Sequence, residues 1–172
     1  GFADCAVDRI VPKASFKNPL DVAVERYTEW DVEKGGWKGE LPDIQGCTFV
    51  DDLSAYIERK LFTLNSGHAI CAYLGALKGR RTIVESIADP AIGQLVYKAM
   101  QESGEGLIQK FGFDPAAHHA YIDRIFARFQ NPFLEDETQR VAREPIRKLS
   151  PTDRLIKPLL TAYGYGLKVD HL

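Results

Sequence analysis

The chain has 172 residues and a formal net charge of −2, with 45% hydrophobic and 27% charged residues. This length suits one compact domain that buries roughly 70% of its unfolded surface and needs no metal or disulfide for stability. The composition excludes a disordered chain and a protein that coats nucleic acid.

Cysteine usage and hydropathy predict the cellular compartment of the protein. The three cysteines, Cys5, Cys47 and Cys71, are widely spaced and odd in number, which argues against a disulfide framework or a zinc site and fits a reducing cytoplasm. No apolar run is long enough to span a membrane, and the N-terminus does not resemble a signal peptide. The abrupt apolar start and the lack of a terminal helix suggest a piece of a longer cytoplasmic protein.

A small β element is expected near the N-terminus. Residues 1–12 form an apolar, strand-like run, and residues 21–33 alternate in places between apolar and polar types. The alternation predicts a strand whose inward positions are Val22, Val24, Tyr27 and Trp30. Three glycines between residues 35 and 39 then indicate a loop.

The remainder of the chain is predicted to be helical. Residues 52–77 carry the longest helical period, interrupted by Gly67, where the helix could bend or a ligand could need the missing side chain. A capping box of Thr82 and Glu85, and three caps that precede proline, then mark helix starts. The predicted helices cover residues 83–88, 90–111, 115–130 and 151–163. The fold class is therefore mainly α.

Three polar residues of the long predicted helix have a spacing that permits a shared site. They follow the order Lys60-x-x-x-x-Asn65-x-x-His68. At about 100° per residue, Lys60 and His68 lie about 80° apart around the axis, and Asn65 lies about 140° from Lys60. One broad face could hold all three, although such residues are also common on a solvated face or as satisfied polar groups in a core.

These residue types match the needs of alcohol oxidation. The reaction requires a group that takes the hydroxyl proton and donors that stabilise the developing alkoxide. A lysine that is partly removed from water, near another positive charge, can accept and return that proton without a metal. Lys60 would do so if buried, while Asn65 would donate an amide N–H and His68 would hold a neighbouring hydroxyl.

Four longer segments resemble the polyol-specific long-chain mannitol dehydrogenases and, among them, the mannitol-1-phosphate 5-dehydrogenases. The segments are VDRIVP from Val7, FVDDL from Phe49, ERKLFTLNSGHA from Glu58 and REPIRKLSPTDRLIKPLL from Arg143. The resemblance runs over essentially the whole chain. It implies the helical C-terminal domain of that family, which is shared distantly with the 6-phosphogluconate dehydrogenases.

The resemblance also implies a reaction, the metal-independent interconversion of D-mannitol 1-phosphate and D-fructose 6-phosphate with NAD. Lys60 would be the general acid/base, Asn65 would stabilise the oxyanion and His68 would bind the substrate. The sugar-phosphate would be the only partner implied, with neither nucleic acid nor membrane, and the oligomeric state stays open.

Further positions match substrate-binding residues of the family. Asp8 resembles a residue that accepts a substrate hydroxyl, with Arg9 beside it, and Arg143 matches an arginine at the sugar end. Arg147 and Lys148 are candidate phosphate ligands, because guanidinium forks and ammonium groups bind phosphate oxygens. Arg9 could instead form a buried salt bridge. The basic stretch could also be a charged surface loop, and Arg140 and Arg154 could contribute equally to a phosphate site.

One departure from the family concerns the cofactor. No Gly-x-Gly-x-x-Gly follows a strand, so we expect residues 1–172 to form the substrate-binding domain, with the NAD-binding Rossmann domain absent and the fragment alone inactive. The cofactor-binding residues are therefore unknown. Two alternatives remain: another long-chain polyol or hexuronate dehydrogenase of the mannitol 2-dehydrogenase type, and a non-catalytic binding domain with the same fold.

Overall fold

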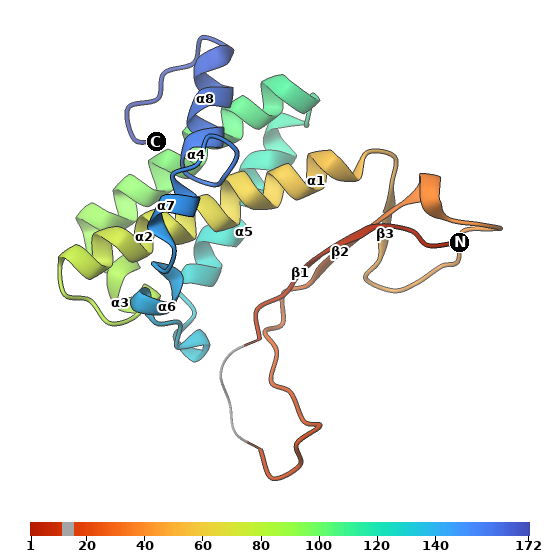
Figure 1. Ribbon diagram of the computed structural model, residues 1–172, viewed down its shortest axis with the longest axis horizontal. Helices are drawn as coiled ribbons and strands as arrows, with labels where there is room; N and C mark the ends of the chain where they lie inside the picture. Colours follow the sequence, from red (N-terminus) through yellow and green to blue (C-terminus); the bar gives the residue numbers. More distant parts are fainter. Residues whose placement is uncertain (12–15) are drawn as a thin grey trace. The chain divides into compact units, whose positions relative to one another are not determined.

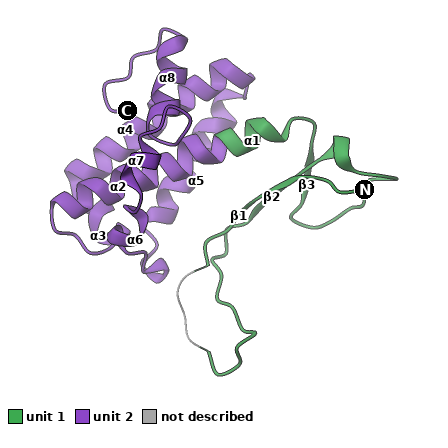
Figure 2. Cartoon of the chain, viewed as in Figure 1, with its two compact units in different colours: residues 1–58 green, residues 59–172 purple. Residues whose placement is uncertain are grey.

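The computed structural model describes residues 1–11 and 16–172 and divides the chain into two compact units. Unit 1 comprises residues Gly1–Glu58 and unit 2 residues Arg59–Leu172 (Figure 2). A small sheet lies near the N-terminus and most of the remaining described residues are helical, which confirms the predicted fold class (Figure 1).

The sheet in unit 1 has three short strands, β1 (Cys5–Asp8), β2 (Glu29–Glu33) and β3 (Thr48–Val50). Strand β2 is central. It pairs antiparallel with β1, where Val7 lies opposite Trp30, and parallel with β3, where Val32 lies opposite Phe49. The short 3-10 helix η1 (Lys34–Gly36) follows β2. Pro12, which ends the VDRIVP segment, lies outside the described residues.

The prediction of a strand over residues 21–33 is correct only from Glu29 onward. Val22 and Val24 are exposed and precede the strand, and Trp30 is also exposed, while Val32 is buried. The ladder with β1 ends where Glu29 meets Asp8, and among the described residues before Glu29 the Glu25 N–H donates to the Ile10 carbonyl over 3.1 Å without extending the strand. Alternation in sequence indicates a strand, but a strand forms only where a neighbour satisfies its backbone groups.

The predicted long helix is confirmed as a helical run that changes type in the middle. It begins as α1 (Leu53–Lys60), continues as the π-helical segment η2 (Leu61–Asn65) and ends as α2 (Ser66–Leu77). Gly67 has a packing reason rather than a ligand, because a Cβ there would lie 2.8 Å from Met100 Sδ and 3.2 Å from Phe129 Cε2.

The predicted caps define the next three helices. Helix α3 (Ile83–Ile87) starts with the complete Thr82 and Glu85 capping box, and α4 (Pro90–Phe111) and α5 (Pro115–Phe129) each begin with proline after an aspartate cap. Helix α4 ends at Gly112, whose φ of 68° is the left-handed conformation that favours glycine. Local sequence signals are reliable here because each cap binds backbone N–H groups of its own first turn.

The C-terminal part contains short elements, and one prediction there is wrong. They are η3 (Pro132–Leu134), α6 (Thr138–Val141), α7 (Pro145–Lys148) and α8 (Ile156–Gly164). Residues 151–155, predicted to begin the last helix, form turns instead. The Ser150 hydroxyl accepts a hydrogen bond from Thr152 N–H, and the Arg154 carbonyl accepts one from the Ser66 hydroxyl. In a helix starting at Pro151 the Arg154 carbonyl would have no internal partner, because the residue four positions on, Pro158, has no N–H and its ring crowds that carbonyl.

Helices α2 and α4 form the centre of unit 2. Helix α2 packs against α3, α4 and α6, and α4 packs also against α5 and α8 (Figure 1). The fully buried side chains include Phe62, Met100, Leu107, Tyr121 and Ile125. Within the described ranges, no helix combines the length and apolar character that crossing a membrane requires.

Candidate functional site

Lys60, Asn65 and His68 lie at the point where the helical run changes type. All three are half-buried, and the residues between them, Phe62 to Leu64, are buried. Ser66 N–H donates to the Leu61 carbonyl, five residues back, as a π-helical turn requires. A turn that closes between residues five apart rotates less per residue than an α-helix. The angle between Lys60 and Asn65 around the helix axis is therefore smaller than the 140° of a regular α-helix.

His68 has a defined partner in a buried carboxylate. Its Nε2 lies 2.9 Å from Oδ2 of Asp136, a residue that is only 8% exposed. The imidazole ring stacks on Phe129 with ring centroids 5.3 Å apart and an angle of 19° between the planes. One ring nitrogen of His68 and one ring face are therefore fixed by the protein.

Asp136 is held from the other side by Arg140. The Arg140 guanidinium donates two hydrogen bonds of 2.7 Å to the two carboxylate oxygens. Burial raises the pKa of the Asp136 carboxyl, but the hydrogen bond from His68 and the charge and hydrogen bonds of Arg140 outweigh it, so the pKa lies below its ordinary value. Asp136 is thus an ionised group inside the protein.

Arg143, the predicted ligand of the sugar end, is anchored to the same segment. It is exposed, and its Nε donates to the Arg140 carbonyl over 3.0 Å. The hydrogen bonds thus run in series from His68 through Asp136 and Arg140 to Arg143. Two of the predicted substrate-binding residues are connected in this way.

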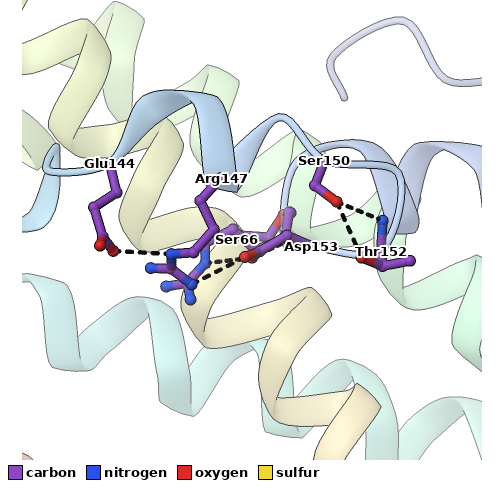
Figure 3. Close-up of polar contacts among 7 residues, drawn as sticks. Ser66, Glu144, Arg147, Ser150, Thr152 and Asp153 are labelled. Carbon is purple, nitrogen blue, oxygen red and sulfur yellow. Dashed lines mark hydrogen bonds and ion pairs between the residues drawn. The ribbon is translucent and has the colours of Figure 1, made fainter.

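The predicted phosphate ligands Arg147 and Lys148 lie with Arg154 around Asp153, and we define these three cations as the basic cluster. Figure 3 shows Arg147 between Glu144 and Asp153. Arg147 bonds Glu144 over 2.8 Å and Asp153 over 3.0 Å, and Arg154 bonds Asp153 over 2.8 Å. Burial and then the charges of Arg154 and Arg147 lower the pKa of Lys148. The three cations of the basic cluster face two carboxylates, those of Glu144 and Asp153, so one positive charge remains uncompensated among these five groups.

The basic cluster is tied to the helix that carries Asn65 and His68. Ser66, which is buried and directly follows Asn65, donates from its hydroxyl to the Arg154 carbonyl over 2.5 Å. Tyr73 lies further along the same helix, and burial raises the pKa of its hydroxyl while the nearby Arg154 and Arg147 lower it to a smaller extent. Among the described residues, the buried Tyr73 hydroxyl has no hydrogen-bond partner.

Asp8 and Arg9 belong to unit 1, unlike the other predicted site residues. Asp8 is buried at the end of β1, opposite Glu29. Arg9 is exposed and donates from Nε to the Glu25 carbonyl over 3.1 Å, while the Glu25 carboxylate accepts from Ile10 N–H over 2.6 Å. Arg9 therefore helps to fasten the chain after β1.

Four residues with evident roles in these contacts were not identified from the sequence, namely Ser66, Tyr73, Asp136 and Asp153. Asp136 stands in the acidic run Glu135 to Glu137, which by itself indicates a solvated loop. Its partner His68 is far away in sequence, and no spacing rule connects them. Only Ser66, adjacent to Asn65 within the polar NSGH segment, carried a local signal.

The three cysteines have free thiols, and burial raises the pKa of Cys71 to about 12. Over residues 1–11 and 16–172, no group of three or more histidine, cysteine, aspartate or glutamate side chains is arranged to hold a metal ion.

Two solved structures share this fold at low sequence identity. A D-sorbitol dehydrogenase in substrate-free form matches 97% of the chain with a TM-score of 0.81 and 21% identity. The mannitol 2-dehydrogenase of Pseudomonas fluorescens, solved as a ternary complex with NAD and D-mannitol, matches 97% with a TM-score of 0.71 and 23% identity. The chain spans 36% of the length of each of these proteins.

Family comparison covers nearly the whole sequence. Residues 1–46 match the family described as the mannitol dehydrogenase Rossmann domain, although they contain no glycine-rich dinucleotide motif. Residues 52–172 match the mannitol dehydrogenase C-terminal domain, and this range includes the helical run, Asp136 and the basic cluster. The chain belongs to the mannitol dehydrogenase family.

Proposed function

We propose that this chain supplies the polyol-binding and proton-transferring part of an NAD-dependent dehydrogenase. The observation that supports this most is the position of Lys60, Asn65 and His68, half-buried on one helical run and joined through a π-helical segment. Such segments frequently occur at functional sites, where they alter which residues share a face. The two solved relatives are named for polyol substrates, which agrees with this proposal.

Each of the three residues has one task. The Lys60 amine accepts the proton of the substrate hydroxyl during oxidation and returns it during reduction. Asn65 donates an amide N–H to the same oxygen, where negative charge develops. His68 binds a neighbouring hydroxyl and so limits the orientations of the polyol.

NAD, when bound, supplies the acceptor for the hydride. The described residues do not fit the dinucleotide, because the sheet pairs β1 antiparallel to β2 and offers no glycine-rich turn between a parallel strand and a helix. We therefore expect NAD to be held by parts of the Rossmann domain other than the matched residues 1–46, and the chain alone to be inactive.

The finer proposal is a phosphorylated substrate, D-mannitol 1-phosphate, with D-fructose 6-phosphate as product. Asp8, Arg9 and Arg143 would hold the polyol. The basic cluster supports a phosphate group because it gathers more cations than carboxylates. A dehydrogenase of free polyols or of hexuronates would keep the helical run and use the basic cluster structurally, and the names of the two solved relatives favour this second candidate.

Replacement of the proposed acid/base tests the proposal. In the intact protein, Lys60→Ala should lower kcat about 10²- to 10⁴-fold, the usual contribution of a positioned proton acceptor. Lys98→Ala, at an exposed lysine of α4, is the matched control and should retain full turnover. Unchanged turnover of Lys60→Ala in a folded protein would remove the catalytic assignment and favour a non-catalytic binding domain.

A further inference from the structure

We propose that Asp136, held by Arg140, is a positioning residue that keeps neutral His68 in one tautomer, with the proton on Nε2 and with Nδ1 presented as a hydrogen-bond acceptor to the substrate. This inference rests on the proposed function. It adds a direction to the contact, because the substrate hydroxyl then donates its proton to His68 rather than accepting one.

The geometry of the pair fixes the tautomer. Nε2 of His68 lies 2.9 Å from a carboxylate oxygen of Asp136. An ionised carboxylate only accepts hydrogen bonds, so Nε2 must carry the hydrogen. In a neutral imidazole the other nitrogen, Nδ1, then has no proton and accepts.

The negative charge of Asp136 is balanced without a proton on Nδ1 of His68. The buried Asp136 carboxylate is compensated by the Arg140 guanidinium, which binds both of its oxygens at 2.7 Å. Arg140 thus supplies the positive charge that the buried carboxylate requires, so the contact with His68 needs only one hydrogen, on Nε2.

The surrounding packing restricts movement of the ring and of the carboxylate. Phe129 stacks on one face of the imidazole. The Asp136 carbonyl accepts a hydrogen bond of 2.8 Å from Ile83 N–H at the start of α3. Because Arg143 is bonded to the Arg140 carbonyl, the same segment also locates a second predicted substrate ligand.

The tautomer can be measured in the 172-residue chain itself, independently of turnover. Nitrogen-15 NMR of labelled protein, recorded well above the ordinary histidine pKa of about 6.5, distinguishes protonated from unprotonated ring nitrogens. We expect His68 to show a protonated Nε2 and an unprotonated Nδ1. Asp136→Asn replaces the carboxylate by an amide that can either accept from Nε2 or donate to it, so it should weaken the preference for one tautomer.

A surface pair provides the control. His119 Nε2 lies 2.7 Å from Glu105, and both side chains are about half exposed, so Glu105→Gln changes the same type of contact without touching His68. It should leave the His68 signals unchanged. A protonated Nδ1 in the wild-type chain would overturn the proposal.

Kinetics of the intact protein separate this inference from the proposed function. Asp136→Asn should lower kcat/KM about 10- to 100-fold, the range typical of residues that orient a ligand-binding histidine. Asp136→Glu, which keeps the carboxylate, should recover part of the loss. If the tautomer shifts as expected but neither Asp136→Asn nor Lys60→Ala alters turnover, the positioning contact is correct and the proposed function is wrong. If Lys60→Ala is inactive while Asp136→Asn retains full kcat/KM, the positioning role is wrong.

Discussion

Arg147 is the residue through which the choice between phosphorylated and free polyols can be examined most directly. Its side chain is 51% exposed, so its replacement should leave the fold intact. If the basic cluster binds phosphate, Arg147→Gln removes a charge-assisted hydrogen bond and lowers kcat/KM for mannitol 1-phosphate about 10- to 100-fold. The value for free mannitol should not change.

A suitable control is Arg80→Gln, because Arg80 is similarly exposed and also pairs with a carboxylate, that of Asp89. Equal losses of kcat/KM on both substrates in Arg147→Gln, or an equal loss in Arg80→Gln, would assign the basic cluster a structural role. Steady-state kinetics of the intact protein with each substrate decides between these results.

Single residues also show what the sequence could and could not predict. The helical period of residues 52–77 predicted the helical run that carries Lys60, Asn65 and His68, and the resemblance to the family indicated Arg147 and Lys148. The partners of these residues were not predictable. His68 meets Asp136, and Ser66 meets the Arg154 carbonyl, only after the intervening helices have packed. Such contacts depend on tertiary structure, which no local pattern encodes.

At the scale of elements, helix starts were predicted best and element types inside the chain least well. The aspartate caps of α4 and α5 and the capping box of α3 were readable because they act on the adjacent turn. The π-helical segment η2 had no sequence signal. The last helix was predicted five residues too early, because Ser150 followed by Pro151 forms a local turn with the same residue types as a cap.

Helix α5 carries a histidine that should make stability depend on pH. His118 is 3% exposed, and neither of its ring nitrogens has a hydrogen-bond partner among the described residues. Burial, followed by the charges of Arg59 and His119, lowers its pKa to about 4. Between the unfolded value of about 6.5 and this folded value, the unfolded chain binds a proton that the folded chain does not.

The free energy of unfolding should therefore fall by about 3 kcal/mol as the pH drops from about 6.5 to about 4, and this contribution should be flat above about 6.5. His118→Leu should remove that part of the slope in urea unfolding experiments. His119→Gln, at the neighbouring exposed position, should retain it. An identical slope in His118→Leu and the wild type would show that other groups cause the pH dependence.

At the scale of the whole molecule, the chain covers 36% of the length of the solved relatives, and its proposed chemistry needs a nucleotide domain. Within unit 2, the helical run connects the residues that we propose for the two ends of the substrate. It carries Lys60, Asn65 and His68, and Ser66 binds it to the basic cluster. In the proposed function, this one helical run positions the residues for both the reacting carbon and the distal group of the polyol.

A crystal structure of the intact protein with a bound polyol tests this account most directly. We predict Lys60 Nζ and Asn65 Nδ2 within about 2.6–3.2 Å of one substrate oxygen, and His68 Nδ1 within the same range of a neighbouring hydroxyl. A polyol bound away from the helical run, or Lys60 directed into solvent on the side opposite Asn65 and His68, would contradict it.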